Sequence, residues 1–248
     1  MNGLKGASRH GLFWLGTSLA VGLIISTVLA MRTVERVKLT NQTITVKGCA
    51  ERLIDSDVIT WGASFSAKGP EMADAYKKLK KDLSVVLDYL GKEGVPDEAI
   101  TVSSISTRVL YAKDERGRST DKITGYRLSQ WAHIRSGDLE KISRISRECT
   151  DLIEKGVEID SAAPSYFYTK FDELKLEMLG EAARDARRRA EQLVKDSGSN
   201  VGPLRSPSQG AFQITSADST EVSNYGVFNT TSWTKKIRAV VTVSYSIR

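Results

Sequence analysis

The chain has 248 residues, 40% hydrophobic and 27% charged, an ordinary balance for a globular protein that excludes collagen-like, disordered and disulfide-rich classes. The formal net charge is +6, but residues 1–38 hold five basic residues against one acidic residue and contribute +4 of it. Because this excess flanks a hydrophobic run and does not belong to the folded part, the charge pattern argues against nucleic acid as a partner.

Segment 11–30 contains twenty residues without a charged side chain. Twenty helical residues span about 30 Å, the thickness of the hydrocarbon layer. We therefore predict a transmembrane anchor here, with an N-terminal tail at 1–10 and a linker at 31–40. A signal segment cleaved after Ala30 is the alternative, although the run is longer than the apolar core of most signal segments. Basic residues flank both ends, so a charge count leaves the orientation open.

The remaining chain, 41–248, predicts one mixed domain. An alternation of apolar and polar residues at 57–68 is typical of a strand with one buried face, and Gly69-Pro70 then ends it and starts a helix. We expect strands over 43–49, 57–68, 100–110 and 123–135, extended chain over 157–171, a final strand near 241–247, and helices over 70–94, 139–155 and 172–196.

This order corresponds to two βαββ units, at about 57–136 and 157–248, with an intervening helix. Helices segregated from a mostly antiparallel sheet are typical of an α+β domain. The sequence therefore predicts an α+β fold preceded by one N-terminal transmembrane helix.

Four stretches in order carry a family resemblance: ITVKGCAERLIDSDVITWGASFSAKG at 44–69, GVPDEAITVSSI at 94–105, GYR at 125–127, and AARDARRRAEQLVKDSGSNVG at 182–202. Together they resemble the SIMPL domain family. Two positions depart from the family pattern, since Cys49 stands where a small or acidic residue is usual and Asp55-Ser56 where a proline is usual.

The resemblance implies a bacterial envelope protein related to periplasmic immunogenic proteins, with two βαββ units, ring-like homo-oligomers and a loose link to stress. It implies no known reaction. We expect a single-pass inner-membrane protein whose C-terminal domain lies in the periplasm; the alternative is a periplasmic protein released by signal cleavage.

No motif for nucleophilic, phosphate-binding or zinc-dependent chemistry occurs in the chain, so we expect no catalytic, cofactor or metal site. The two histidines, His10 and His133, lie far apart in sequence. Cys49 and Cys149 are interpreted as small buried side chains, with a disulfide as the alternative. The four arginines at 184 and 187–189 are either a solvated helix face or a site for an anionic partner.

Two groups of residues indicate association, because mixtures of aromatic side chains and arginine are enriched at interfaces. Each group could equally cover the protein's own core. The candidates are Arg127, Trp131, His133 and Arg135 on one strand, and Phe212, Tyr225 and Phe228 in the polar region before the last strand.

We therefore expect a non-catalytic, membrane-anchored envelope protein that self-assembles or binds envelope partners. The alternatives are an enzyme with an unrecognised carboxylate-based site and a monomeric ligand-binding module.

Overall fold

The computed structural model describes residues 7–40, 42–221 and 223–247. It divides into two compact units, where the sequence analysis treats 41–248 as one domain. The first unit comprises Met1–Ala50, Leu179–Gly210 and Val240–Arg248, and the second comprises Glu51–Met178 and Ala211–Ala239. Each unit is described by itself.

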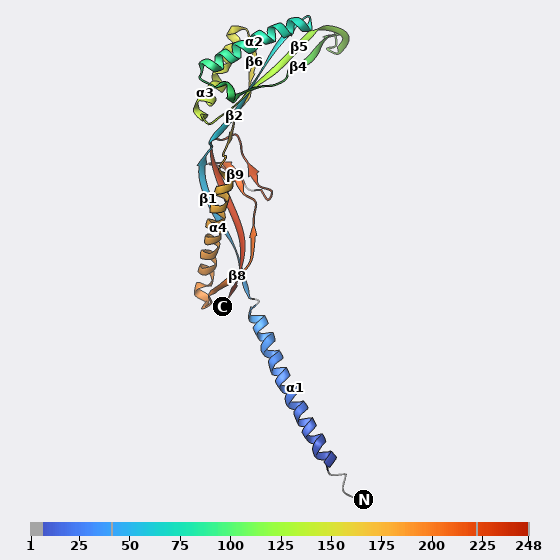
Figure 1. Ribbon diagram of the computed structural model, residues 1–248, viewed down its shortest axis with the longest axis vertical. Helices are drawn as coiled ribbons and strands as arrows, with labels where there is room; N and C mark the ends of the chain where they lie inside the picture. Colours follow the sequence, from blue (N-terminus) through green and yellow to red (C-terminus); the bar gives the residue numbers. More distant parts are fainter. Residues whose placement is uncertain (1–6, 41, 222, 248) are drawn as a thin grey trace. The chain divides into compact units, whose positions relative to one another are not determined.

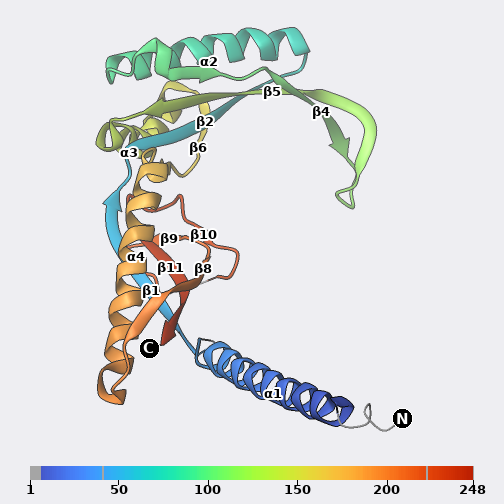
Figure 2. The ribbon, with the colours of Figure 1, turned by 60° about the horizontal axis from the view of Figure 1, so that its bottom comes forward.

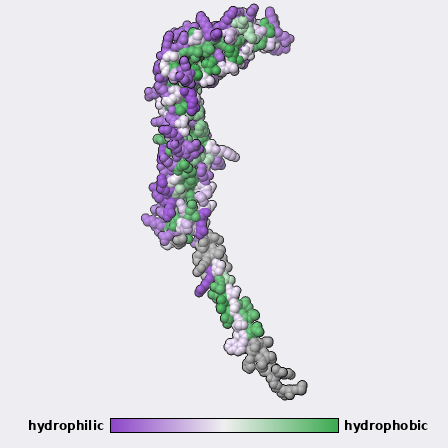
Figure 3. All heavy atoms as spheres, in the orientation of Figure 1, coloured by the Kyte–Doolittle hydropathy of each residue, from purple (hydrophilic) through white to green (hydrophobic). Residues whose placement is uncertain are grey.

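The N-terminal helix α1 spans Ala7–Thr40 and is longer than the expected segment 11–30. It includes the expected linker at 31–40, because no glycine or proline follows Ala30 to end a helix. Within α1, Phe13–Thr33 is long and apolar enough to cross a membrane, with a mean hydropathy of 1.9 and none of it buried. The apolar side chains of this stretch are exposed in Figure 3.

A six-stranded antiparallel sheet forms the centre of the second unit (Figure 1). Its strand order is β3-β5-β2-β6, with β4 also paired to β5 and β7 to β2. The strands are β2 (Val58–Gly69), β3 (Ile100–Val102), β4 (Ser106–Lys113), β5 (Ser119–Ser136), β6 (Glu158–Ser161) and β7 (Ser165–Phe167).

The strand expected over 100–110 is divided into β3 and β4. Ser103 interrupts the ladder, because its backbone N–H donates to the Trp131 carbonyl at 2.9 Å while its hydroxyl accepts from the Trp131 N–H at 3.0 Å. A side chain therefore takes the place of a backbone partner at this point of β5.

The helices of the second unit cover one face of this sheet, and Figure 2 shows α2 lying along β2 and β5. They are α2 (Met72–Lys92), the 3-10 turn η1 (Asp97–Ala99), α3 (Leu139–Glu148) and η2 (Cys149–Lys155). Asp138 caps α3 by accepting a hydrogen bond from the Lys141 N–H. The apolar residues of the alternating strand, among them Ile59 and Phe65, are fully buried against these helices.

A second sheet has the order β1-β11-β9-β10, with β8 also paired to β11. Its strands are β1 (Thr43–Asp55), β8 (Val201–Gln209), β9 (Gln213–Ser216), β10 (Val227–Phe228) and β11 (Thr234–Ile247). Between Val58 and Ser136 the elements follow the order β2, α2, β3, β4 and β5, so two strands take the place of the one expected over 100–110. In the second half, β6 and β7 pair with β2 whereas β8 and β11 belong to the other sheet, so those strands do not form one βαββ sheet.

Helix α4 (Phe171–Val194), followed by the 3-10 turn η3 (Lys195–Ser197), contributes three fully buried alanines to the first unit, Ala182, Ala186 and Ala190. Their small side chains let β1 approach closely: a Cβ at Gly48 would overlap the Ala182 carbonyl oxygen and lie 2.5 Å from the Ala186 nitrogen. Gly48 is therefore required by packing.

Asp185 on α4 joins this helix to β1, because its carboxylate accepts a hydrogen bond from the Cys49 N–H at 3.0 Å. This bond, supported by Arg189 at 2.7 Å and Arg188 at 3.6 Å, lowers the pKa of the Asp185 carboxyl. Cys149 is a buried thiol and Cys49 is half-buried, so the interpretation as small buried side chains is confirmed only for Cys149.

Candidate binding face on the six-stranded sheet

The face of the six-stranded sheet opposite α2 and α3 is polar, and we call it the polar face. Cross-strand register arranges its side chains in rows that succeed one another along β2 and β5. The rows are Thr60 with Arg135; Gly62 with His133 and Thr101; Ser64 with Trp131 and Asp160; Ser66 with Ser129, Ser106 and Glu158; and Lys68 with Arg127 and Arg108.

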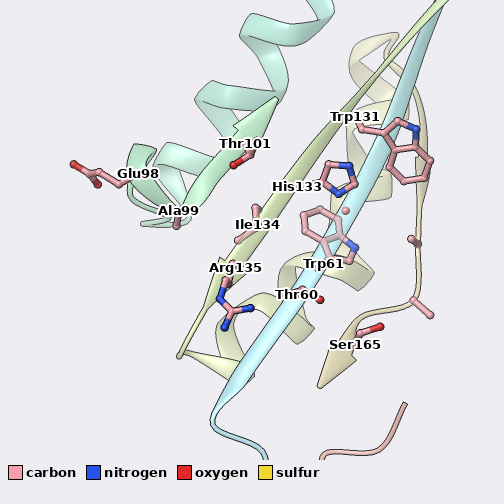
Figure 4. A pocket seen from close by; sticks show the side chains of 13 residues that line it. Thr60, Trp61, Glu98, Ala99, Thr101, Trp131, His133, Ile134, Arg135 and Ser165 are labelled. Carbon is pink, nitrogen blue, oxygen red and sulfur yellow. The ribbon is translucent and has the colours of Figure 1, made fainter. Parts of the chain in front are cut away.

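A cavity of about 590 Å³ opens at one end of the polar face. The Trp131 and His133 rings form one wall and stack nearly parallel, with centroids 5.5 Å apart and planes 8° from parallel. Both rings project over β2 in Figure 4. Gly62 makes room for the imidazole, since a Cβ there would lie 2.7 Å from His133 Nδ1. The opposite wall comes from Ala162, Ala163 and Ser165, where the chain passes from β6 to β7.

A second hollow of about 370 Å³ lies further along the same face. Glu158 is its central acceptor, with hydrogen bonds from the Ser66 hydroxyl at 2.6 Å and Lys68 Nζ at 2.8 Å. These bonds hold the pKa of the Glu158 carboxyl below its usual 4.5, so Glu158 is ionised at neutral pH. Arg127 lies at the 4.0 Å limit of an ion pair with Glu158, and its Nε has no hydrogen-bond partner in the described structure.

The polar face offers hydroxyl, carboxylate and guanidinium groups beside an aromatic wall, which are the means to bind a ligand by hydrogen bonds and stacking. The first cavity is less suited to acid–base catalysis by a histidine–carboxylate pair. Glu98, the carboxylate that lines the first cavity, points away from the His133 ring in Figure 4. The lining places no carboxylate toward the imidazole.

The structure brings together one of the two groups that the sequence analysis selects. Arg127, Trp131, His133 and Arg135 share the polar face, and three of them line the first cavity. Trp131, His133 and Arg135 are exposed on this face, Trp131 by 39%, so these three side chains are not buried in the core.

The second group has divided roles. The Phe212 ring packs edge-on against Phe171 at 5.7 Å, so this side chain stabilises its own unit. Tyr225 is 98% exposed and Phe228 64% exposed. Within the described chain, no hydrogen bond or ring contact joins these three residues to Trp131 or His133.

Sequence reasoning missed several contributors to the site. Gly62 left a signal, because an isolated glycine within an alternating strand often marks a close approach. Thr101 and the 162–165 segment left none, since their positions depend on pairing between strands distant in sequence.

Arg184, Arg187 and Arg188 of α4 line a separate hollow of about 570 Å³ in the first unit. Arg187 pairs with Glu191 at 2.9 Å, and Arg188 and Arg189 pair with Asp185. Their charges are thus largely balanced along the helix, which favours a solvated face over a site for an anionic partner. Among the residues that the structure describes, no group of three histidine, cysteine or acidic side chains is placed to hold a metal ion.

Comparison with known proteins agrees with the sequence motifs. No curated protein matches the chain. Residues 44–245 match the SIMPL family, described as a protein of unknown function (DUF541). Since this match covers most of the chain, the protein belongs to the SIMPL family.

Proposed function

We propose that this chain is a non-catalytic, membrane-anchored protein of the cell envelope, with its folded part in the periplasm, that acts by binding through the polar face. The observation that carries the proposal is the aromatic wall of Trp131 and His133 in a cavity on a helix-free sheet face. Leaving the apolar ring of a tryptophan half-exposed to water is unfavourable in free energy. Exposed tryptophans are enriched where proteins bind partners.

The apolar stretch of α1 supports the anchor. Twenty-one residues from Phe13 to Thr33 reach about 30 Å as a helix, enough to cross the hydrocarbon layer. Cleavage of a signal segment after Ala30 would instead release a periplasmic form. The mass of the mature protein distinguishes the anchored form from the cleaved form.

Membrane fractionation of cells that express the full chain tests the anchor. We expect the intact chain in the membrane pellet, retained after carbonate washing and released by detergent. Recovery of the intact chain in the soluble fraction would overturn the proposed anchor.

Self-assembly is a second candidate function, favoured by one specific feature of the hairpin that β4 and β5 form. Tyr111 and Ile123 are direct cross-strand partners and are 47% and 49% exposed. An exposed apolar pair of this kind is suited to burial against a second copy.

Sedimentation of the full chain in detergent tests this second function. We expect a concentration-dependent oligomer that the double substitution Tyr111→Ser/Ile123→Thr weakens. Leu176→Gln is the matched control, because Leu176 is 75% exposed on α4 and does not belong to the hairpin. A wild-type chain that stays monomeric at every concentration would exclude self-assembly.

A further inference from the structure

We propose that the polar face binds a neutral carbohydrate chain, with Trp131 as the stacking surface and the two hollows beside it as subsites. This inference rests on the proposed binding function and gives it a ligand class. It is argued from the order of the rows, the chemistry of the side chains and their charge.

The two hollows flank Trp131 along the strands. The first cavity includes His133 and Arg135 on one side of it, and the second hollow includes Ser129 and Arg127 on the other. The five rows follow one another every two residues along the strands, so the distance from the first row to the fifth is about 27 Å. This length suits an extended chain of several units better than a single small molecule.

Hydroxyl recognition requires donors and acceptors close together, because each sugar hydroxyl can both donate and accept. The second hollow supplies both kinds, and only Ile159 among its lining residues is apolar. The polar ones are Ser64, Ser66, Ser106, Arg108, Arg127, Ser129, Glu158 and Asp160. A peptide groove would need apolar pockets for side chains, and this hollow offers almost none.

The charges of the second hollow argue against an anionic ligand. Arg108 and Arg127 are opposed there by Glu158 and Asp160, and Lys68 is already engaged by Glu158. A phosphate or sulfate in this hollow would lie beside carboxylates as well as guanidinium groups. A neutral polyhydroxyl chain instead uses carboxylates as acceptors and arginines as donors.

Trp131 supplies the apolar component. Trp131 is 39% exposed at the side of the first cavity nearest the second hollow. The electron-rich face of an indole attracts the weakly positive C–H groups of a sugar ring. His133, stacked behind it over Gly62, holds the indole in place. Arg127, which lines the second hollow, adds guanidinium donors.

The test is calorimetric titration of the full chain in lipid nanodiscs, prepared without glycoside detergents because these would compete. The probes are maltotetraose, cellotetraose and tetra-N-acetylchitotetraose. We expect at least one to bind with a dissociation constant of about 0.1–1 mM, typical of a shallow site. Trp131→Ala should weaken that binding about tenfold or more, and Arg127→Gln should weaken it as well.

Tyr225→Ala is the matched control, since it removes a fully exposed aromatic side chain that lines neither hollow. It should bind like the wild type. If Trp131→Ala lacks a normal melting transition, Arg127→Gln alone decides the result.

Three results would overturn the inference: no heat with any probe up to about 10 mM, equal affinity of the wild type and both variants, or binding of a sulfated oligosaccharide or peptide in place of the neutral probes. If the chain does not bind carbohydrate but fractionates with membranes, the proposed anchor is still supported. Carbohydrate binding by a chain found in the soluble fraction would overturn the anchor alone.

Discussion

Replacing Gly48 with alanine tests the close packing of β1 against α4 in the first unit. The added Cβ would meet the Ala182 carbonyl oxygen and the Ala186 nitrogen. Both are backbone atoms of a helix, so no change of side-chain rotamer relieves the overlap, and the strand or the helix must move. Overpacking of this kind costs about 3 kcal/mol, equivalent to a melting temperature lower by about 6–12 °C for a protein of this size.

The assay is thermal and urea denaturation of the full chain in detergent, followed by circular dichroism. Gly91→Ala is the matched control, because Gly91 lies in α2 with no atom within 4 Å of an added Cβ. It should raise stability by about 0.5–1 kcal/mol, since alanine favours the helix. A Gly48→Ala variant as stable as the wild type would refute the proposed contact.

Three further substitutions have defined outcomes. Asp185→Ala should lower the free energy of unfolding at pH 7, measured with urea, by about 1.5–3 kcal/mol, because the Cys49 N–H loses its acceptor. Since the pKa of Asp185 is lowered from 3.8, the difference in stability between wild type and variant should shrink as the pH falls below 3.8. A difference that does not change in acid would contradict this. Lys235→Met should lower the free energy of unfolding by about 1–3 kcal/mol, because the buried ammonium donates to two carbonyls. Burial lowers the pKa of Lys235 below 10.5, so the wild type should gain stability relative to the variant as the pH rises toward 10.5. A difference in stability that falls over this pH range would refute the prediction. Gly62→Ala should displace the His133 ring and weaken binding at the polar face. The melting temperature should change little, because the nearest obstructing atoms belong to the exposed His133 side chain, which can move. Unchanged NMR shifts of the imidazole would argue against this displacement.

The sequence predicted elements whose signals are local. The alternation at 57–68 and the Gly69-Pro70 boundary predicted β2 and the start of α2 closely. The expected strand over 123–135 likewise places Arg127, Trp131, His133 and Arg135 on one face of β5, because side chains in a strand point to opposite sides in turn. The contribution of β5 to the candidate site could therefore be named from the order of residues alone.

Features that depend on distant pairing were not predictable. The division of β6 and β7 from β8 and β11 between two sheets depends on which partners the strands choose, and strand periodicity does not encode the partner. For the same reason the second wall of the cavity, at 162–165, was missed. The length of α1 was underestimated because the sequence analysis ended the helix with the apolar run, whereas the polar residues after it are also compatible with a helix.

Thiol labelling of Tyr225→Cys in spheroplasts tests the central claim, an exported body held by its N-terminal helix. Tyr225 is 98% exposed, so a cysteine there reacts readily, and the wild type with its two native cysteines measures the background. The account predicts that a membrane-impermeant maleimide labels the variant above background without lysis, and that the labelled chain remains in the membrane fraction. Labelling that requires lysis of the spheroplasts would place the folded part inside the cell and contradict the account.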